Sequence, residues 1–139
     1  MKEMIDNLIS KIEMEEGNES KMYVCPAGYL TIGAGINLDK QRIPEPVARQ
    51  WLLFILQDIE TALNKHKFMH GLDGARKIVV YDMAYQMGVS GVLAFERMIA
   101  CIADHDYTQA AVELLDSKYA RQTPNRANRN AEILRTGKI

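Results

Sequence analysis

Apolar residues recur at helical spacing at the amino end of the chain. Glu and Lys residues separate them, and the apolar positions are Met4, Ile5, Leu8, Ile9 and Ile12. A three-and-four spacing of this kind predicts an amphipathic helix. Gly17 provides the stop, because glycine readily adopts the backbone conformation that closes a helix.

The pattern then changes to short β-prone runs. Residues 21–24 and 29–32 are two such runs, and Cys25-Pro26-Ala27-Gly28 joins them. Proline at the second position and glycine at the fourth suit a type I turn. These residues therefore predict a β-hairpin.

A long, strongly apolar segment follows. Pro44 and Pro46 mark its start, since proline is tolerated in the first turn of a helix. The segment 45–65 predicts one long helix with apolar residues almost all round. Such a helix must be covered on several sides, so we expect a central core helix with Trp51 in the core.

The remainder of the chain predicts short helices over residues 75–87, 91–103, 107–118 and 124–134. Asp106 with Gln109 is a capping-box pattern, and Thr123-Pro124 is typical of a helix N-cap followed by proline. The pattern as a whole predicts a helix, a small hairpin lobe, a long linking helix and a helical lobe.

Composition excludes several classes of protein. The 139 residues are 47% hydrophobic and 25% charged, which is ordinary for one globular domain and argues against disorder. The longest strictly apolar run, residues 51–56, is too short to span a bilayer. Acidic residues stand where a secretion signal would be basic, so we expect synthesis and retention in the cytoplasm.

Charge is uneven along a chain whose net charge is −1. Residues 1–20 carry two lysines against six acids, whereas residues 118–139 carry six Lys or Arg against one Glu. The basic end either faces an anionic polymer or neutralises the acidic end across the fold. Its basic residues lack interleaved aromatics, which argues against a nucleic-acid partner.

The cysteines and histidines do not indicate a metal site. Cys25 and Cys101 are too few for a disulfide scaffold, and they show no metal-ligand spacing with His66, His70 and His105. We expect neither a metal nor a cofactor.

Glu16 is the first candidate for catalysis. It falls at the carboxyl end of the first predicted helix, where the backbone dipoles disfavour a negative charge. A carboxyl group in that place suits a general acid, although it is also one of six acids in a solvated stretch.

Three sets of residues resemble one family. Glu16, Cys25 and Thr31, with eight and then five residues between them, resemble the catalytic motif of the phage-type lysozymes, the endolysins of glycoside hydrolase family 24. Its middle residue is usually Asp, with Cys in some members. Tyr85-Gln86-Met87-Gly88 resembles the second signature of that family. Residues 122–129 and 135–137 resemble the third.

The resemblance implies a predominantly helical α+β fold of the lysozyme type. It would be a single domain over residues 1–139, with a hairpin lobe at about 13–45 and a linking helix at about 45–66. The helical lobe would comprise residues 70–139 together with 1–12. Ile36 stands where the family often has His, and the short segment after it implies a trimmed small lobe.

The resemblance also implies an activity, hydrolysis of the β-1,4 bond between N-acetylmuramic acid and N-acetylglucosamine in bacterial peptidoglycan. Glu16 would be the general acid, and Cys25 and Thr31 would position water. Arg126 would pair with the catalytic Glu and stabilise its charged form, which opposes the helix-end effect. The matching sugar contacts are Gly35, Tyr85 and Gln86, with Glu113 matched by alignment alone.

Cys25 leaves three hypotheses open. It positions water with Thr31, giving inversion; or its thiolate attacks carbon, giving retention; or the position is dispensable or oxidised. Two other functions also stay open, a lytic transglycosylase acting on the same polymer and a wall-binding homologue without catalysis.

The family implies how such a protein works in the cell. We expect a monomer without stable membrane insertion that waits in the host cytoplasm. It would reach the cell wall after a holin opens the membrane.

Overall fold

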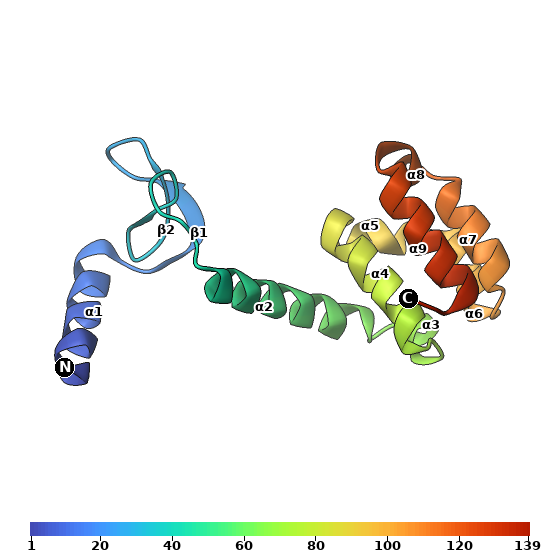
Figure 1. The fold of residues 1–139 in the computed structure, drawn as a ribbon, viewed down its shortest axis with the longest axis horizontal. Coiled ribbons are helices and arrows are strands. Elements are labelled where there is room, and N and C mark those ends of the chain that lie inside the picture. The colour runs from blue at the N-terminus through green and yellow to red at the C-terminus, as the bar shows by residue number, and fades with distance from the viewer. The chain divides into compact units, whose positions relative to one another are not determined.

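The computed structural model describes residues 1–139. It divides into two compact units, Met1–Ala48 and Arg49–Ile139, which Figure 1 colours from blue to green and from green to red. The helix α2 (Glu45–Leu63) crosses the boundary between them. The prediction that residues 1–12 belong with the helical lobe stays a prediction.

The first unit holds one helix and a small antiparallel sheet. The helix is α1 (Lys2–Glu16), and the strands are β1 (Glu19–Val24), β2 (Leu30–Gly33) and β3 (Ile36–Asn37), in the order β1-β2-β3. Tyr23 pairs with Thr31, and Thr31 pairs in turn with Asn37. The predicted helix and hairpin are confirmed, whereas β3 is too short for a sequence pattern to reveal.

The predicted turn closes the hairpin. The Gly28 amide donates to the carbonyl oxygen of Cys25 at 2.8 Å, and the Cys25 amide donates to that of Tyr29 at 2.9 Å. These two bonds place Cys25 at the start of a four-residue turn. Its side chain therefore sits at the tip of the hairpin.

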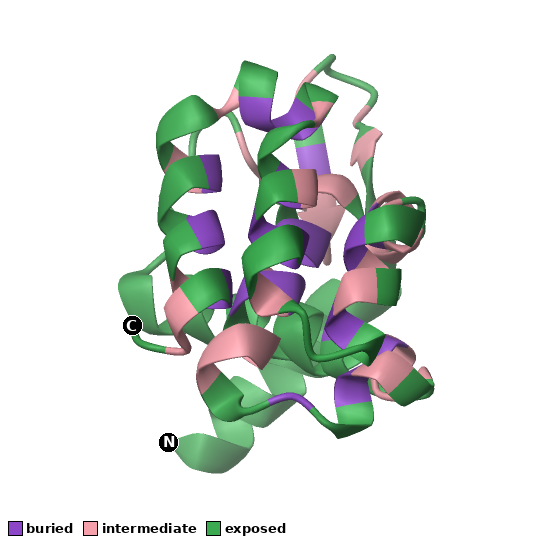
Figure 2. Ribbon diagram, turned by 90° about the vertical axis from the view of Figure 1, so that its right-hand side faces the viewer, coloured by how far each residue is buried: buried purple, intermediate pink, exposed green.

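The second unit is helical. Beyond α2 it contains α3 (Lys67–His70), α4 (Gly74–Met87), α5 (Val89–Leu93), α6 (Glu96–Ala103), α7 (Tyr107–Leu115), α8 (Lys118–Gln122) and α9 (Pro124–Thr136). The helix α9 packs against α4, α7 and α8. Figure 2 shows buried residues on the inward sides of these helices. The core includes Leu63, Met69, Val79, Val80, Met83, Met98, Leu114 and Leu134. The predicted α+β, predominantly helical fold is confirmed.

Two helix boundaries differ from the prediction. The predicted helix 91–103 is broken between α5 and α6 at Ala94 and Phe95. Phe95 has ψ 60°, and its ring meets that of Tyr119 edge to face with 6.4 Å between centroids. The predicted helix 107–118 ends at Leu115, because Ser117 accepts a hydrogen bond from the Ala120 amide and starts α8.

The long helix is confirmed, but its cover within the second unit is partial. Ile59 and Leu63 are buried, whereas Trp51 is 44% exposed. The side chains of this unit therefore bury only the carboxyl end of α2. We predicted that Trp51 lies in the core, but the other residues of its own unit do not bury it. No helix combines the length and apolar character needed to cross a bilayer.

The predicted caps are partly confirmed. The Asp106 carboxylate accepts a hydrogen bond from the Gln109 amide at 3.1 Å, but the Gln109 side chain turns to Glu113 instead of closing the box. Thr123 precedes Pro124 at the start of α9, as predicted. Its hydroxyl donates to the carbonyl oxygen of Tyr119 at 3.1 Å and leaves the amides of α9 uncapped.

Candidate active site

Glu16 lies against the turn that joins β2 to β3. It is the last residue of α1, and its carboxyl group approaches the Cα of Gly35. A Cβ built on Gly35 would be 2.9 Å from Oε2 of Glu16 and 3.0 Å from its Cδ. Two of the residues predicted for the site are thus in direct contact within the first unit.

Cys25 and Thr31 form a second pair in the same unit. Thr31 is 2% exposed, and its hydroxyl donates to the carbonyl oxygen of Tyr29 at 2.9 Å. The backbone of Tyr29 lowers the pKa of the Cys25 thiol by a hydrogen bond, and partial desolvation opposes it. Hydrogen bonds from Thr31 and the turn lower this pKa further. Such donors favour the thiolate, which is the nucleophilic and basic form of cysteine.

Tyr85 and Gln86 lie in the second unit, on the last turn of α4. Tyr85 is 49% exposed. The Gln86 side chain lines a hollow of about 680 Å³, which Tyr119, Thr123 and Glu113 also line. Its Nε2 donates to the Thr123 hydroxyl at 3.4 Å. Both predicted sugar contacts are accessible to a ligand.

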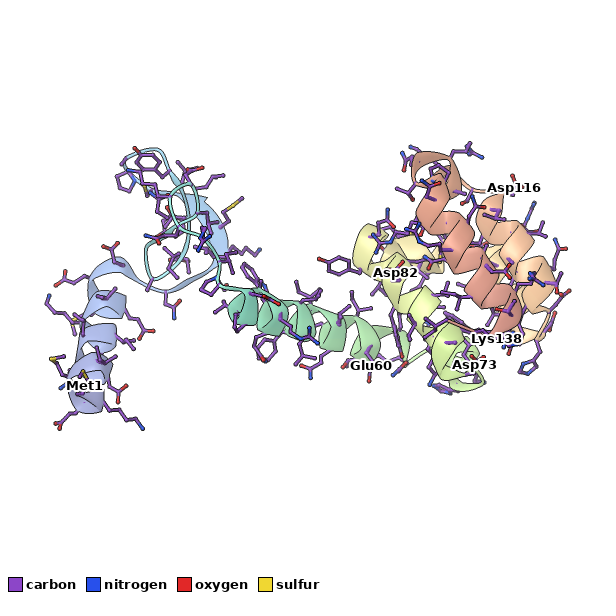
Figure 3. The ribbon with its side chains drawn as sticks, viewed as in Figure 1. Met1, Glu60, Asp73, Asp82, Asp116 and Lys138 are labelled. Atoms are coloured by element: carbon purple, nitrogen blue, oxygen red, sulfur yellow. The ribbon has the colours of Figure 1, made fainter.

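Arg126 is bound by a residue that sequence reasoning did not single out. Its Nε donates to Oδ2 of Asp82 at 3.0 Å, and its Nη2 donates to Oδ1. Asn130 donates through Nδ2 to Oδ2 of Asp82 at 2.8 Å and to the Tyr119 hydroxyl at 3.0 Å. Figure 3 labels Asp82 on α4. The predicted pairing of Arg126 with Glu16, which lies in the other unit, stays a prediction.

The charges of this cluster are coupled. Burial alone would raise the pKa of Asp82, but the hydrogen bonds from Arg126 and Asn130 outweigh it and lower that pKa. The hydrogen bond with Asp82 raises the pKa of Arg126, and partial desolvation opposes it. One signal in the sequence marks Asp82, because this charged residue lies within a helical segment two residues after the core residue Val80 and directly before the core residue Met83.

The remaining titratable residues form no metal centre. Nowhere do three or more His, Cys, Asp or Glu side chains gather as a metal ion would require. Cys25 and Cys101 are both free thiols. Cys101 is partly buried against the core of the second unit.

The family follows from a comparison with known sequences. The family model described as Phage lysozyme matches residues 13–132, which include every residue predicted for the site. The chain belongs to the phage lysozyme family. The predicted resemblance is confirmed, and membership supports a lysozyme-like peptidoglycan hydrolase in general.

Three curated relatives are consistent with this family assignment. Probable T4-type lysozymes 1 and 2 of Dictyostelium discoideum are 26% and 25% identical to the chain, and each alignment covers 98% of both partners. The pre-baseplate central spike protein Gp5 of Enterobacteria phage T4 is 26% identical over 96% of this chain and 28% of its own length. The slime-mould alignments span 166 positions against 139 residues here, so these relatives carry residues that this chain lacks.

Proposed function

We propose that this member of the phage lysozyme family is a muramidase. It cleaves the β-1,4 bond between N-acetylmuramic acid and N-acetylglucosamine in bacterial peptidoglycan. The observation that carries the proposal is the contact of Glu16 with Gly35 in the same unit that sets Cys25 beside Thr31.

Glu16 is the general acid. Glycoside hydrolysis requires a carboxylic acid that protonates the leaving oxygen while a second group works at the anomeric carbon. The Glu16 carboxyl lies over a residue with no side chain, so a sugar ring can approach it without a steric barrier from position 35. Gly35 thus supports both the acid and the sugar contact that the resemblance assigns to it.

Cys25 and Thr31 act on the attacking water. The Thr31 hydroxyl orients the water, and the Cys25 thiolate takes its proton as the water oxygen bonds to the anomeric carbon. Glu16 meanwhile gives its proton to the departing oxygen, so the reaction balances and inverts the anomeric configuration. The lowered pKa of Cys25 supports a thiolate in this role.

The second unit supplies binding. Tyr85 and Gln86 match sugar contacts of the family, and their exposure supports that assignment. By the same match, Arg126 is the arginine that supports the catalytic acid in the family. Its guanidinium is held by Asp82, which fixes its direction.

Clearing of a turbid cell-wall suspension tests the acid. Glu16→Gln removes the transferable proton and keeps the shape, so we expect clearing to fall at least a hundredfold. The matched control is Glu13→Gln, one turn earlier on the exposed face of α1, which should clear at the wild-type rate. Undiminished clearing by Glu16→Gln would refute the proposal.

The anomer released first tests the role of the thiol. NMR of the initial product should show inversion, and a retained configuration would instead indicate attack by the thiolate on carbon. Cys25→Asp restores a carboxylate and should stay active. A fully active Cys25→Ala protein would remove the thiol from the mechanism.

Product mass separates hydrolysis from the other two functions. Hydrolysis adds one water, whereas a lytic transglycosylase leaves anhydromuramic ends that are lighter by one water. A protein that pellets with the wall but never clears it, with or without Glu16→Gln, would be a wall-binding homologue.

A further inference from the structure

Gln86 and Thr123 form a hydrogen-bonded pair at the hollow of the second unit. Gln86 is on the last turn of α4, and Thr123 directly precedes α9, 37 residues further along the chain. Both side chains line the hollow of about 680 Å³, and Nε2 of Gln86 donates to the Thr123 hydroxyl at 3.4 Å. Both residues belong to the same compact unit.

The single proton of the Thr123 hydroxyl is already used. The hydroxyl donates to the carbonyl oxygen of Tyr119 at 3.1 Å. A hydroxyl has one proton and two acceptor lone pairs, so a hydroxyl that donates once can only accept from a second partner. The second partner here is the amide nitrogen of Gln86, which is the end of that side chain that carries protons. Thr123 therefore determines which way the Gln86 amide faces.

This orientation leaves the oxygen of the Gln86 amide for a ligand. Its nitrogen is turned to Thr123, and Gln86 is an exposed residue. A sugar hydroxyl can donate or accept, so it would bind either end of an amide. An N–H group can only donate, and a carbonyl group can only accept. A fixed Oε1 of Gln86 therefore favours ligand N–H groups over ligand carbonyl groups.

The charged side chains of the hollow also favour a ligand that donates. Three carboxylates and two cations line it: Glu96, Glu113 and Asp116, against Arg97 and Lys118. None of the five is in an ion pair. Because carboxylates only accept hydrogen bonds, acceptors outnumber donors among these charged groups.

We propose that Thr123 is a positioning residue that fixes Oε1 of Gln86 as an acceptor for an amide N–H group of the peptidoglycan strand. The inference rests on the proposed function, which gives Gln86 a substrate contact, and it adds which end of the amide binds and what holds it. Peptidoglycan carries such N–H groups in the acetamido substituents of its sugars and in its stem peptides. Both offer the same donor to Oε1.

Thr123→Val removes the hydroxyl and little else. The Tyr119 carbonyl oxygen keeps a donor, because the backbone amide of residue 123 donates to it at 2.9 Å. No amide of α9 loses a cap, since the Thr123 side chain caps none of them. Valine also keeps the branched shape at the β-carbon. The variant thus isolates the effect of the hydroxyl on Gln86.

NMR of the full chain tests the orientation without any ligand. The Nε2 protons of Gln86 should give nuclear Overhauser effects to the side chain of Thr123, because the nitrogen is the end that lies 3.4 Å from the hydroxyl. In Thr123→Val these effects should weaken as the amide loses its partner. In Thr123→Ser, which keeps a hydroxyl, they should persist. Their absence from the wild-type protein would overturn the inference.

Titration of Glu16→Gln with chitotetraose and with a disaccharide that carries a stem peptide tests binding. This background is used so that the probes stay intact. Adding Thr123→Val should raise Kd about threefold to tenfold, as loss of one neutral hydrogen bond does, and Thr123→Ser should recover most of that loss. A rise for both probes assigns the acetamido N–H, and a rise for the second probe alone assigns the peptide N–H.

Two substitutions of Gln86 show which end of its amide binds. Gln86→Glu keeps an acceptor at the hollow, and the Thr123 hydroxyl can donate to the second carboxylate oxygen, whereas Gln86→Met removes both ends. Gln86→Met should raise Kd about threefold to tenfold, and Gln86→Glu should raise it much less. Equal losses would mean that the nitrogen is the binding end, and they would overturn the inference.

A matched control comes from the same hollow. Gln122, at the end of α8, also lines it, so Gln122→Met makes the same change of side chain beside Gln86. This variant should bind both probes as its parent does. A loss as large as that of Gln86→Met would show that any polar side chain of the hollow contributes equally, and it would overturn the role of the oriented amide.

A double-mutant cycle shows whether Thr123 acts through Gln86. In a Gln86→Met background the further change Thr123→Val should leave Kd where Gln86→Met alone puts it. A second loss of equal size would mean that the Thr123 hydroxyl acts independently of Gln86, and it would contradict a positioning role.

The outcomes separate this inference from the proposed function. If Glu16→Gln clears cell walls like the wild type, the proposed function fails, and the Overhauser effects still decide the orientation of Gln86. If Glu16→Gln is inactive but binds neither probe, or if Thr123→Val leaves the affinity for both probes unchanged, the inference alone fails.

Discussion

The carboxyl group of Glu16 occupies the space in which a side chain at position 35 would stand. A Cβ there would stand 3.1 Å from Cγ of Glu16 and closer still to its Oε2. Gly35 also has φ +73°, a conformation that residues with a side chain rarely adopt. Glycine is thus favoured at this position for two reasons: the backbone has a positive φ, and a side chain would collide with the carboxyl group of Glu16.

Gly35→Ala should therefore reduce activity more than stability. The left-handed backbone costs about 1–2 kcal/mol with alanine, which the fold can tolerate. The new methyl group meets the flexible end of Glu16 and displaces its carboxyl, and a misplacement of about 1 Å can cost about a hundredfold in rate. Clearing assays and urea unfolding of the same preparation measure the two effects.

Gly33→Ala is the matched control for backbone strain. Gly33 has φ +61° in the same unit, but a Cβ there would meet only ordinary contacts, at 3.7 Å from Oδ1 of Asn18 and 3.8 Å from Cδ1 of Ile36. It should lose similar stability and little activity. Equal losses of activity in the two variants would argue against displacement of Glu16.

The two cysteines should differ in reactivity. The bond with the Tyr29 backbone, helped by the turn amides and Thr31, lowers the pKa of Cys25 against an opposing desolvation. Desolvation, with nearby acids such as Asp106 and Glu113, raises the pKa of Cys101. Because the thiolate is the reactive form, iodoacetamide should alkylate Cys25 first, and at a lower pH.

Mass spectrometry of peptides after timed alkylation measures both rates in one sample. Thr31→Val removes one donor to the thiol and should slow the reaction of Cys25 while leaving that of Cys101 unchanged. A faster reaction at Cys101 in the wild type would contradict the prediction.

Asp82 should make stability depend on pH. Although burial opposes it, the bonds from Arg126 and Asn130 leave the folded-state pKa of Asp82 below its unfolded value of about 3.9. A lowered pKa means that the stabilisation is present above the unfolded value and is lost as the pH falls through the folded one. Asp82→Asn should thus cost about 1–2 kcal/mol at pH 7 and much less at about pH 2.5.

Urea unfolding of the two proteins at both pH values provides the comparison. All other carboxyl groups are common to the pair, so their titration cancels in the difference. Because the side chains of the ion pair are partly exposed, we expect the loss of unfolding free energy at pH 7 to lie nearer to about 1 kcal/mol than to about 2 kcal/mol. A difference that is the same at pH 7 and pH 2.5 would exclude titration of Asp82 as its source.

Local patterns account for most of the fold. The stripe from Met4 to Ile12 predicted α1, and the turn residues from Cys25 to Gly28 predicted the hairpin, because in both cases the determining contacts are close in sequence. The break at Phe95 was beyond such reasoning. It has neither glycine nor proline, and the ring of its Phe95 packs on that of Tyr119, 24 residues further along the chain.

The candidate site likewise combines residues that a local sequence pattern indicates with residues whose partners are distant in the sequence. The spacing of Glu16, Cys25 and Thr31 carried the resemblance that assigns them to the site, and this assignment stays a prediction. The turn that holds Cys25 is local in sequence. Asp82 was missed because its partners are 44 and 48 residues away along the chain. An acid within a helix is usually solvated, and only the packing of α9 against α4 gives this one a partner.

Arg76 should contribute strongly to stability by capping the carboxyl end of α9. Its Nε donates to the carbonyl oxygen of Leu134 at 2.7 Å and its Nη2 to that of Arg135 at 3.2 Å, so it caps the carboxyl end of α9. The guanidinium also lies 3.7 Å over the ring of Tyr107. Positive charge at this end of a helix is favourable, and charged hydrogen bonds are the stronger kind.

Arg76→Met keeps the apolar stem and removes these bonds, so the free energy of unfolding should fall by about 2–3 kcal/mol. Arg135→Met is the control, because Arg135 pairs with Glu132 at the surface with side chains 50% and 61% exposed, and its loss should cost less than about 1 kcal/mol. Urea unfolding at neutral pH measures both variants. If they lose the same amount, the capping role of Arg76 is wrong, since surface pairing alone would then explain its contribution.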